Sequence, residues 1–176
     1  EPRPIVVFDF DLTLTRWDTA DRFFRWLLRR DPWRLSLLLL ALPLLAPLLL
    51  VRRTRKWPVH CAVWIATLGR APPDLVLLAR EHADAVSAGG DAVFLQEGLA
   101  RLQWHQEQGH RVVIATGCLE PLARALLERA GQGQVPLVAS TLRPFLGGMA
   151  SDRHCFGANK IPMLAERGFP PPWAIA

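Results

Sequence analysis

The sequence predicts an α/β protein with a Rossmann-like three-layer α/β/α core, a parallel sheet and one inserted all-helical cap. Apolar runs rich in β-branched residues recur at 5–8, 111–117 and 135–140, and such runs are typical of strands buried on both faces of a parallel sheet. Helical patterns alternate with these runs, except in one long stretch where several helical patterns follow one another without a strand. We therefore expect a discontinuous core, residues 1–15 and 94–176, and a helical cap, residues 16–93.

Two carboxylates mark the end of the first predicted strand. Asp9 and Asp11 follow the apolar run at positions i and i+2. At the carboxyl end of a central strand, such a pair points into the crevice where open α/β sheets bind their ligands. Because two acids this close repel each other, we expect a shared proton or a divalent cation to offset the repulsion.

Within the cap, helical patterns are expected at 17–30, 55–69 and 73–87. The first has acidic residues in its first turn and arginines in its last, as the helix dipole favours. The third opens with proline and is followed by glycine, which is the usual punctuation of a helix. The glycine-rich residues 89–91 are the expected hinge back into the core.

Residues 35–51 form an apolar, leucine-rich segment of seventeen residues without a charge. As a straight helix it would reach about 26 Å, short of the roughly 30 Å hydrocarbon core of a bilayer. Pro43 and Pro47 would bend or break such a helix. Positive charges on both flanks fit a segment that enters and leaves the same cytoplasmic membrane surface. The flanking residues are Arg29, Arg30, Arg34, Arg52, Arg53, Arg55 and Lys56. The alternatives are a buried helical hairpin in a soluble domain and a true membrane span.

The rest of the chain returns to alternating elements. Helices are expected at 94–108, 120–130 and 159–167, and a short hairpin or flap with two glycines at 142–149. Residues 170–176 begin a fourth strand. An element order of strand, helical insertion, helix, strand, helix, strand, helix, strand favours a parallel sheet with helices on its faces.

Charge and cysteine content restrict the partners and the compartment. The net charge is +5, and its excess lies within residues 16–95 without the aromatic patterning of a nucleic-acid surface. We therefore expect no nucleic acid, and attraction to a membrane or an anionic substrate instead. Three cysteines without a C-x-x-C pair, and no secretory signal before the first strand, indicate a reducing, cytoplasmic location.

Three motifs together resemble the haloacid dehalogenase superfamily in its phosphatase branch. They are Asp9-x-Asp11-x-Thr13-x-Thr15, Thr116-Gly117 and Lys160, and the resemblance covers the chain from Ile5 to Ala176. A helical module between the first two motifs is similar to the phosphoserine-phosphatase-like group, subfamily IB. The arginine-flanked apolar cap and the pattern Asp-x-Thr-Leu-Thr-x-x-Asp-Thr look similar to bacterial phosphatases that act on phosphatidylglycerophosphate.

The resemblance implies a role for each motif. Asp9 would attack a phosphate monoester and form an aspartyl-phosphate, a reaction within the ordinary chemistry of a carboxylate. Asp11 would protonate the leaving oxygen and then activate water, and its presence favours a phosphatase over a dehalogenase. Lys160, the Thr116 hydroxyl and the Gly117 N–H would bind the phosphoryl oxygens.

A magnesium ion and a substrate surface also follow from the resemblance. Mg²⁺ would be held by the Asp9 carboxylate and the backbone carbonyl of Asp11, since it prefers hard oxygen ligands. The family's remaining metal-binding acids follow the fourth strand, so we expect them after Ala176. Arg16, Trp17 and Arg22 are candidates for substrate contact at the start of the cap, although an exposed helix face explains them equally well.

Three functions are therefore open. The leading one is a magnesium-dependent phosphomonoesterase that acts on a lipid-linked phosphate such as phosphatidylglycerophosphate, with peripheral membrane contact through residues 35–51 at the cytoplasmic face. The second is a soluble phosphatase of a small metabolite such as phosphoserine. The third is a catalytically silent, membrane-associated binding module with the same fold. The sequence leaves the oligomeric state open.

Overall fold

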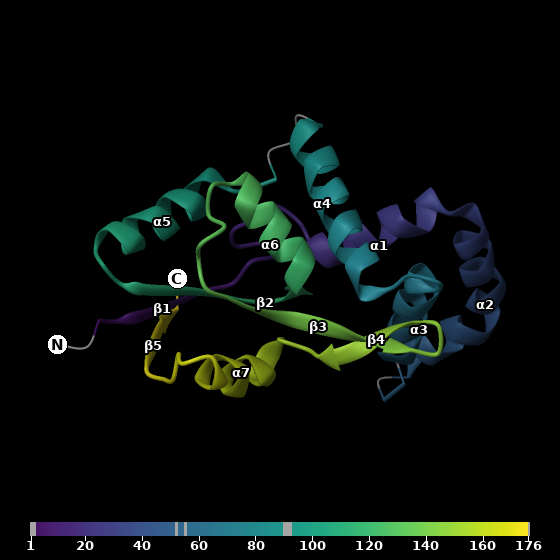
Figure 1. Ribbon diagram of the computed structural model, residues 1–176. Helices are drawn as coiled ribbons and strands as arrows, with labels where there is room; N and C mark the ends of the chain where they lie inside the picture. Colours follow the sequence, from purple (N-terminus) through teal and green to yellow (C-terminus); the bar gives the residue numbers. More distant parts are fainter. Residues whose placement is uncertain (1–2, 52, 55, 90–92, 176) are drawn as a thin grey trace.

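A five-stranded sheet of order β4-β3-β2-β1-β5 forms the centre of the computed structural model, which describes residues 3–51, 53–54, 56–89 and 93–175 (Figure 1). β1 pairs in parallel with β2 and β5, and β2 pairs in parallel with β3. β4 is antiparallel to β3 and closes one edge. The predicted α/β fold with a parallel sheet is confirmed. The strands are β1 (Ile5–Phe8), β2 (Arg111–Leu119), β3 (Leu137–Phe145), β4 (Gly148–Arg153) and β5 (Trp173–Ile175).

Alternate side chains of the strands supply two hydrophobic clusters, one on each face of the sheet. Val6 and Ile114 belong to one cluster, while Val7 and Val113 belong to the other. This alternation is the two-residue period of a strand that is buried on both faces. Helices α5 (Gln96–Glu107) and α6 (Glu120–Arg129) lie on one side of the sheet, and α7 (Lys160–Glu166) lies on the other (Figure 1). The core therefore has the three layers that the sequence predicts.

Four helices fill the segment between β1 and α5: α1 (Thr19–Arg30), α2 (Pro32–Leu50), α3 (Lys56–Thr67) and α4 (Pro72–Ala88). α1 and α3 contact each other, α3 packs against β4, and α4 packs along α6. Buried residues of α1 and α4, such as Phe23 and Ala79, join the same cluster as the α6 face of the sheet. Of the predicted hinge 89–91, Gly90 and Asp91 lie outside the described residues.

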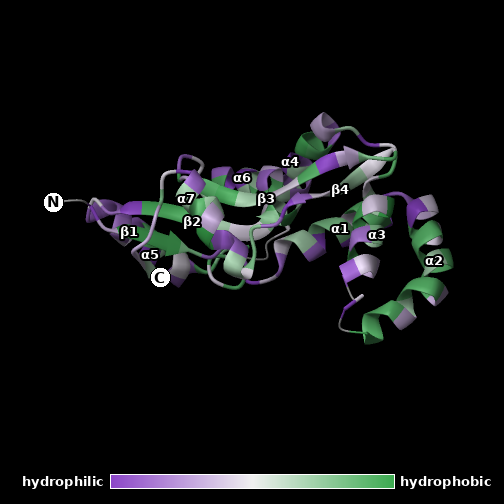
Figure 2. Cartoon of the chain, turned by 90° about the horizontal axis from the view of Figure 1, so that it is seen from below, coloured by the Kyte–Doolittle hydropathy of each residue, from purple (hydrophilic) through white to green (hydrophobic). Residues whose placement is uncertain are grey.

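The apolar segment is a single exposed helix, which decides against one of the alternatives left open by the sequence. α2 runs without a break through Pro43 and Pro47 and its axis curves, so of the two expected effects of these prolines the helix shows a bend and not a break (Figure 1). The alternative of a buried hairpin is wrong, because α2 is one helix and most of its leucines are exposed. Leu40, Leu44 and Leu50 are 77%, 79% and 88% exposed. Figure 2 shows α2 as an almost wholly hydrophobic element at one end of the molecule.

The charges that flank α2 are arranged differently from the sequence expectation. Arg34 is buried, forms an ion pair with Asp31 and donates to the carbonyl of Leu68, so its charge is used inside the protein. Arg70 donates to the same Asp31 carboxylate. The base of α2 is thereby fixed to the connection between α3 and α4. Arg52 and Arg55 lie outside the described residues.

The predicted hairpin at 142–149 is confirmed, and it joins the sheet to the helical insertion. Its turn is formed by Leu146 and Gly147, both with positive φ, of 44° and 78°. Trp64 Nε1 of α3 donates to the Phe145 carbonyl at 3.0 Å, and the Gly69 N–H donates to the Gly147 carbonyl at 2.6 Å. The tip of the hairpin therefore lies against α3 rather than projecting into solvent as a free flap.

Candidate active site

Asp9 and Lys160 meet at the carboxyl end of β1. Asp9 is the first residue after the strand, and Lys160 is the first residue of α7. Lys160 Nζ lies 2.7 Å from Asp9 Oδ2, and the backbone N–H of Phe10 donates to Asp9 Oδ1 at 2.7 Å. The Asp9 side chain remains 48% exposed. It is thus an accessible carboxylate with a cation beside it, as a group that attacks a phosphate must be.

Asp11 lies in a different environment, because it points into the protein. Its Oδ1 accepts hydrogen bonds from the backbone N–H of Thr19 at 2.8 Å and from Thr19 Oγ1 at 2.7 Å. Its Oδ2 accepts a longer hydrogen bond of 3.3 Å from Thr116 Oγ1. Burial raises the pKa of Asp11, and the charge of Asp18 raises it further, while the hydrogen bonds from Thr19 and Thr116 oppose the rise. A carboxyl group with a raised pKa is suited to donate a proton near neutral pH.

The acidic motif forms a tight turn directly after β1. The N–H groups of Leu14 and Thr15 both donate to the Phe10 carbonyl, at 2.9 and 3.0 Å. Leu12, between Asp11 and Thr13, has a φ of 59°, a conformation that L-residues rarely adopt. A backbone held in this region at a candidate site is a common sign of a constraint imposed by function. The turn allows Asp9 and Asp11 to face different partners although they are two residues apart.

Thr116 and Gly117 lie at an irregular end of β2. The register between β2 and β3 shifts between Thr116 and Leu119, and the Cys118 N–H donates to Thr116 Oγ1 at 2.9 Å. Gly117 faces Phe156 and His154, since a Cβ placed on Gly117 would lie 3.6 and 3.8 Å from their rings. The side of Gly117 that lacks a Cβ therefore faces the segment that precedes Lys160's helix. Burial raises the pKa of the Cys118 thiol, which keeps this cysteine protonated and unsuited to nucleophilic attack.

The structure brings two of the three predicted substrate residues together. The Arg22 guanidinium lies 3.9 Å from the centre of the Trp17 ring. The Trp17 carbonyl lies 3.0 Å from Thr15 Oγ1, which connects this pair to the turn of the acidic motif. Arg16 is exposed, and its backbone N–H donates to the Val93 carbonyl at 3.1 Å. A role for the three in substrate binding stays a prediction.

The donor set at the end of β1 fits magnesium in its chemistry. Asp9 offers an accessible carboxylate, and Asp11 offers a backbone carbonyl, which are hard oxygen ligands. Mg²⁺ commonly binds through one or two carboxylates and completes its shell with water and substrate phosphate. Within residues 3–51, 53–54, 56–89 and 93–175, no group of three or more His, Cys, Asp or Glu is arranged to hold a metal.

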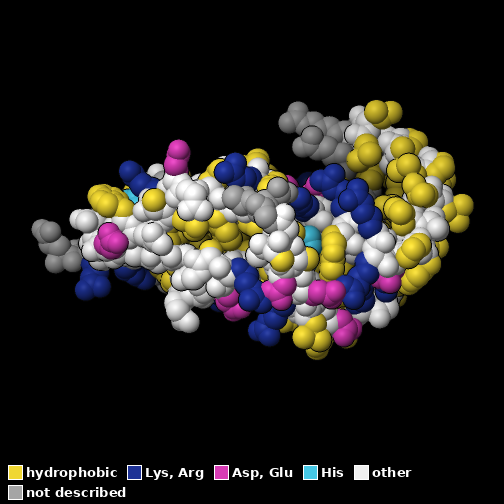
Figure 3. All heavy atoms as spheres, turned by 90° about the horizontal axis from the view of Figure 1, so that it is seen from above, with side chains coloured by type: hydrophobic (Ala, Val, Ile, Leu, Met, Phe, Trp, Pro, Cys, Tyr) yellow, Lys and Arg dark blue, Asp and Glu magenta, His cyan; other side chains and the backbone are white. Residues whose placement is uncertain are grey.

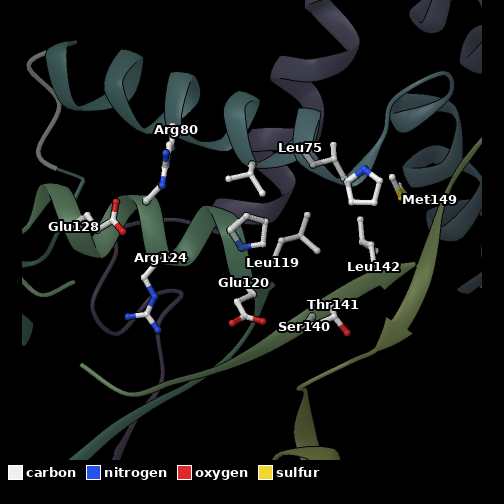
Figure 4. A pocket seen from close by; sticks show the side chains of 14 residues that line it. Leu75, Arg80, Leu119, Glu120, Arg124, Glu128, Ser140, Thr141, Leu142 and Met149 are labelled. Carbon is white, nitrogen blue, oxygen red and sulfur yellow. The ribbon is translucent and has the colours of Figure 1, made fainter. Parts of the chain in front are cut away.

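A groove of about 410 Å³ lies elsewhere, between α4, α6 and the β3–β4 hairpin (Figure 4). Apolar side chains such as Leu75, Leu119 and Leu142 line it, with Arg80 and Glu128 toward one end. Its lining residues include none of the predicted catalytic or phosphate-binding residues. The candidate site therefore lies at the carboxyl end of β1, around Asp9 and Asp11, and not in this groove.

Thr19 is the last residue of the pattern Asp-x-Thr-Leu-Thr-x-x-Asp-Thr, but the sequence interpretation gave it no role. It supplies two of the three hydrogen bonds that the described part of the chain makes to the Asp11 carboxylate, and it is only 2% exposed. The available signal was the pair Asp18-Thr19 at a helix start, eight residues after Asp11. Such a pair indicates a capped helix N-terminus, but the pattern does not say which carboxylate that terminus faces.

Comparison with known proteins gives one family and several solved structures of similar fold. A sequence model of haloacid dehalogenase-like hydrolases matches residues 6–176. The fold is similar to a protein of unknown function from Bordetella pertussis Tohama I, at 17% identity and a TM-score of 0.62, covering 97% of this chain and 78% of that one. It is also similar to a phosphoserine phosphohydrolase-like protein from Francisella tularensis subsp. tularensis SCHU S4, at 12% identity and a TM-score of 0.60, covering 98% and 76%. A phosphoserine phosphatase from T. onnurineus matches at 17% identity and a TM-score of 0.50, covering 94% and 70%.

Proposed function

The chain belongs to the haloacid dehalogenase-like hydrolase family, and on this premise we propose that it is a phosphatase that hydrolyses phosphate monoesters through an aspartyl-phosphate. The observation that supports the proposal is that two carboxylates at the carboxyl end of β1 have different environments. Asp9 is accessible and paired with Lys160, while Asp11 is buried with a raised pKa. Two carboxyl groups in unlike environments are suited to unlike roles in catalysis.

Asp9 performs the first bond change. One of its oxygens attacks the phosphorus atom, the bond from phosphorus to the ester oxygen breaks, and the phosphoryl group is transferred to Asp9. The charge on the phosphoryl oxygens is offset by Lys160, the Thr116 hydroxyl and the Gly117 N–H. Lys160 already lies 2.7 Å from the attacking carboxylate, so it is in place to contact the phosphoryl group as it arrives.

Asp11 moves the protons in both steps. Its carboxyl proton goes to the ester oxygen as that oxygen leaves, which yields the free alcohol and a carboxylate at Asp11. This carboxylate then takes a proton from water, and the water oxygen attacks phosphorus and displaces Asp9. Inorganic phosphate is released, Asp9 is regenerated, and Asp11 again holds its proton. The raised pKa of Asp11 supports the first of these transfers.

Magnesium would be held by the Asp9 carboxylate and the Asp11 backbone carbonyl. When bound there, it would neutralise phosphate charge that Lys160 alone does not balance. The helices of residues 16–93 would act as a cap over the carboxyl end of β1, with Trp17 and Arg22 at its entrance. In the proposal, Trp17 and Arg22 hold and orient the substrate, while Asp11 transfers the protons.

The test is the hydrolysis of 4-nitrophenyl phosphate by the full chain with magnesium. Asp9→Asn should lower the rate by roughly 10³-fold or more, since it removes the nucleophile. Asp84→Asn is the matched control, because Asp84 lies in an exposed ion pair with Arg129. A phosphorylated peptide that contains Asp9 should be trapped in the parent and absent from the variant. An unchanged rate in Asp9→Asn would overturn the proposal, and a parent chain that turns over no phosphate monoester would favour a silent binding module.

For the substrate, we propose a lipid-linked phosphate at the cytoplasmic membrane face, on the evidence of α2. This helix is long and apolar enough to cross a membrane by length and composition, with a mean hydropathy of 2.0, and only 6% of it is buried. A helix that is apolar on all sides is normally buried in protein or in lipid. Figure 3 shows the hydrophobic side chains gathered at this end of the molecule. Covering them with lipid would bring a membrane-borne phosphate close to the cap.

The connections of α2 favour contact with a single leaflet over a membrane span. α2 follows α1 and precedes α3 in the chain, and α1 and α3 contact each other. A helix that crossed the bilayer would separate these two neighbours by about 30 Å of hydrocarbon. We therefore propose that α2 lies in one leaflet, with its ends at the same surface.

Vesicle flotation tests the lipid proposal. The parent should bind vesicles of phosphatidylcholine and phosphatidylglycerol. Leu40→Asp with Leu44→Asp should weaken binding by about tenfold or more, because two leucines that the lipid would cover are lost. Leu77→Asp is the matched control, since Leu77 is 64% exposed on α4. If the parent ignores vesicles but self-associates through these leucines, a second copy covers α2 and the lipid proposal is wrong.

A soluble phosphatase of a small metabolite is the second candidate. The fold likeness to proteins described as phosphoserine phosphohydrolase-like and phosphoserine phosphatase favours it. The value of kcat/KM separates the two candidates. A higher kcat/KM for phosphoserine than for phosphatidylglycerophosphate in mixed micelles would select the small metabolite, and the reverse would select the lipid.

A further inference from the structure

We infer that Thr19 is a positioning residue that fixes the Asp11 carboxylate so that Oδ2, and not Oδ1, exchanges the proton with substrate and water. The inference rests on the proposed function, since it specifies how the proposed acid and base is held. Thr19 is the first residue of α1, so the entry helix of the insertion begins on the carboxylate that the acidic motif carries.

The two oxygens of Asp11 have unequal surroundings. Oδ1 accepts from both the N–H and the Oγ1 of Thr19, at 2.8 and 2.7 Å. Among the described residues, Oδ2 accepts one hydrogen bond, from Thr116 Oγ1 at 3.3 Å, which is at the long end of a hydroxyl hydrogen bond. An oxygen that already accepts two short hydrogen bonds has little capacity left to take up a proton. The proton of Asp11 is therefore placed on Oδ2.

Oδ2 is also the oxygen directed toward the phosphate-binding groups. Its neighbour Thr116 lies on β2, one residue before Gly117. In the proposed function, these two residues bind the phosphoryl group, so a proton on Oδ2 is on the side where the ester oxygen leaves. A proton on Oδ1 would point into α1 instead.

The surroundings of Thr19 hold its own side chain in place. Thr19 is buried, and its Oγ1 lies 3.0 Å from Cys118 Sγ on β2. The residue before it, Asp18, caps α1 separately by accepting from the Asp21 N–H at 2.9 Å. The start of α1 thus places two carboxylates near its free N–H groups, and the positive end of the helix favours their charge. Because Asp18 supplies the N-terminal cap, the Thr19 hydroxyl is not needed for capping and donates to Asp11.

This placement has a kinetic consequence that depends on the leaving group. An alkyl phosphate needs a proton on its departing oxygen, whereas 4-nitrophenolate leaves readily without one. Loss of the Thr19 hydroxyl should therefore slow the first step for an alkyl phosphate but not for 4-nitrophenyl phosphate. The second step needs Oδ2 as base for every substrate, so it should slow in both cases.

The experiment compares Thr19→Val with Thr19→Ser in the full chain with magnesium. Thr19→Val keeps the shape and removes the hydroxyl. It should lower kcat for glycerol 3-phosphate at least about tenfold more than the first turnover of 4-nitrophenyl phosphate. It should also produce a burst of nitrophenolate, as phosphorylated Asp9 accumulates. Thr19→Ser should restore the parental kcat ratio and abolish the burst.

Thr67→Val is the matched control. Thr67 is a buried threonine of α3 whose hydroxyl accepts from the Met149 N–H at 2.9 Å and which lies outside the acidic motif. It should change both substrates equally and give no burst. If Thr19→Val behaves like Thr67→Val, or if Thr19→Ser fails to rescue, Thr19 has only a structural role and the inference is overturned.

Two further measurements keep the outcomes separate. The thermal midpoint of each variant reports folding. If Thr19→Val does not fold, Thr19→Ala takes its place, since the smaller side chain also lacks the hydroxyl. Failure of the proposed function is recognised independently, because Asp9→Asn would then retain the parental rate while the comparison at Thr19 would have no phosphorylated intermediate to detect.

Discussion

Lys160 Nζ and Asp9 Oδ2 lie 2.7 Å apart although the two residues are 151 positions apart in the chain. The contact depends on the packing of α7 against the sheet. Met163 and Leu164 of α7 are buried in the cluster that also contains Val7 of β1. That packing sets the first residue of α7 beside the first residue after β1. The cation of the candidate site is therefore positioned by the hydrophobic core.

Lys160→Met should lower the rate of phosphate monoester hydrolysis by about 10²–10³-fold, because a preorganised charge beside the phosphoryl group is lost. Lys160→Arg should recover part of the rate, since it keeps the charge in a different geometry. Lys56→Met on α3 is the control for losing a lysine elsewhere. Steady-state kinetics with 4-nitrophenyl phosphate measure the effect, and an unchanged kcat/KM would remove Lys160 from the site.

Asp31→Ala should destabilise the protein by about 3–5 kcal/mol, because it leaves two largely buried guanidinium groups without their shared carboxylate. Both Arg34 and Arg70 pair with Asp31, and their side chains are 9% and 8% exposed. Asp84→Ala removes an exposed ion pair with Arg129 and should cost less than about 1 kcal/mol. Urea unfolding of the two variants tests the difference, and equal losses would contradict it.

Stability should fall as the pH falls from about 6.5 to 4, and His82 should account for part of the loss. Burial between Phe23 and Trp26, together with the charge of Arg22, lowers the pKa of His82 to about 4. The unfolded chain, with a histidine pKa near 6.5, binds the proton more readily, so protonation favours unfolding. The stabilisation is complete above the unfolded pKa and is lost below it.

His82→Leu should reduce the loss of unfolding free energy between pH 7 and pH 5 by about 2 kcal/mol, because this position no longer titrates. The exposed His60→Gln serves as the control and should keep the parental slope. Urea unfolding at both pH values gives the numbers. A parental slope in His82→Leu would show that His82 is not the group responsible.

Gly98→Ala should disturb the acidic motif from outside it. A Cβ on Gly98 of α5 would lie 2.6 Å from the Thr13 carbonyl, so the turn that carries Asp11 would have to move. We expect a loss of about 1–3 kcal/mol in stability and a lower kcat. Gly117→Ala is the comparison for stability, because its Cβ would meet Phe156 at an ordinary 3.6 Å. Equal thermal midpoints for the two variants would contradict the steric argument.

Local patterns in the sequence were sufficient to predict the core. The strands at 5–8 and 111–117 can be predicted from their own residues, because a strand that is buried on both faces is a continuous apolar run. The helices of the insertion were predicted for the same reason. The antiparallel β4 was expected only as a hairpin or flap, and the contact of its tip with Trp64 of α3 is one that no local pattern contains.

The residues of the candidate site come from sequence motifs, whereas their contacts come from the structure. Asp9, Asp11, Thr116, Gly117 and Lys160 follow from their motifs, and the structure links Asp9 with Lys160 and Asp11 with Thr116. Thr19 was missed because its role depends on how α1 is oriented, which no local pattern contains. The burial of Arg34 was missed for a similar reason, since its partner carbonyl at Leu68 is 34 residues away.

The position of β1 between β2 and β5 determines the order in which the fold can form. Ile5 is paired with Arg111 on one side and with Trp173 on the other. During synthesis, the first strand therefore has no partner until more than a hundred further residues have been made, and α2 is complete long before that. Folds dominated by such distant pairings form slowly, and their exposed apolar segments are prone to aggregate meanwhile. Any surface that covers the leucines of α2 during synthesis should therefore raise the yield of folded protein.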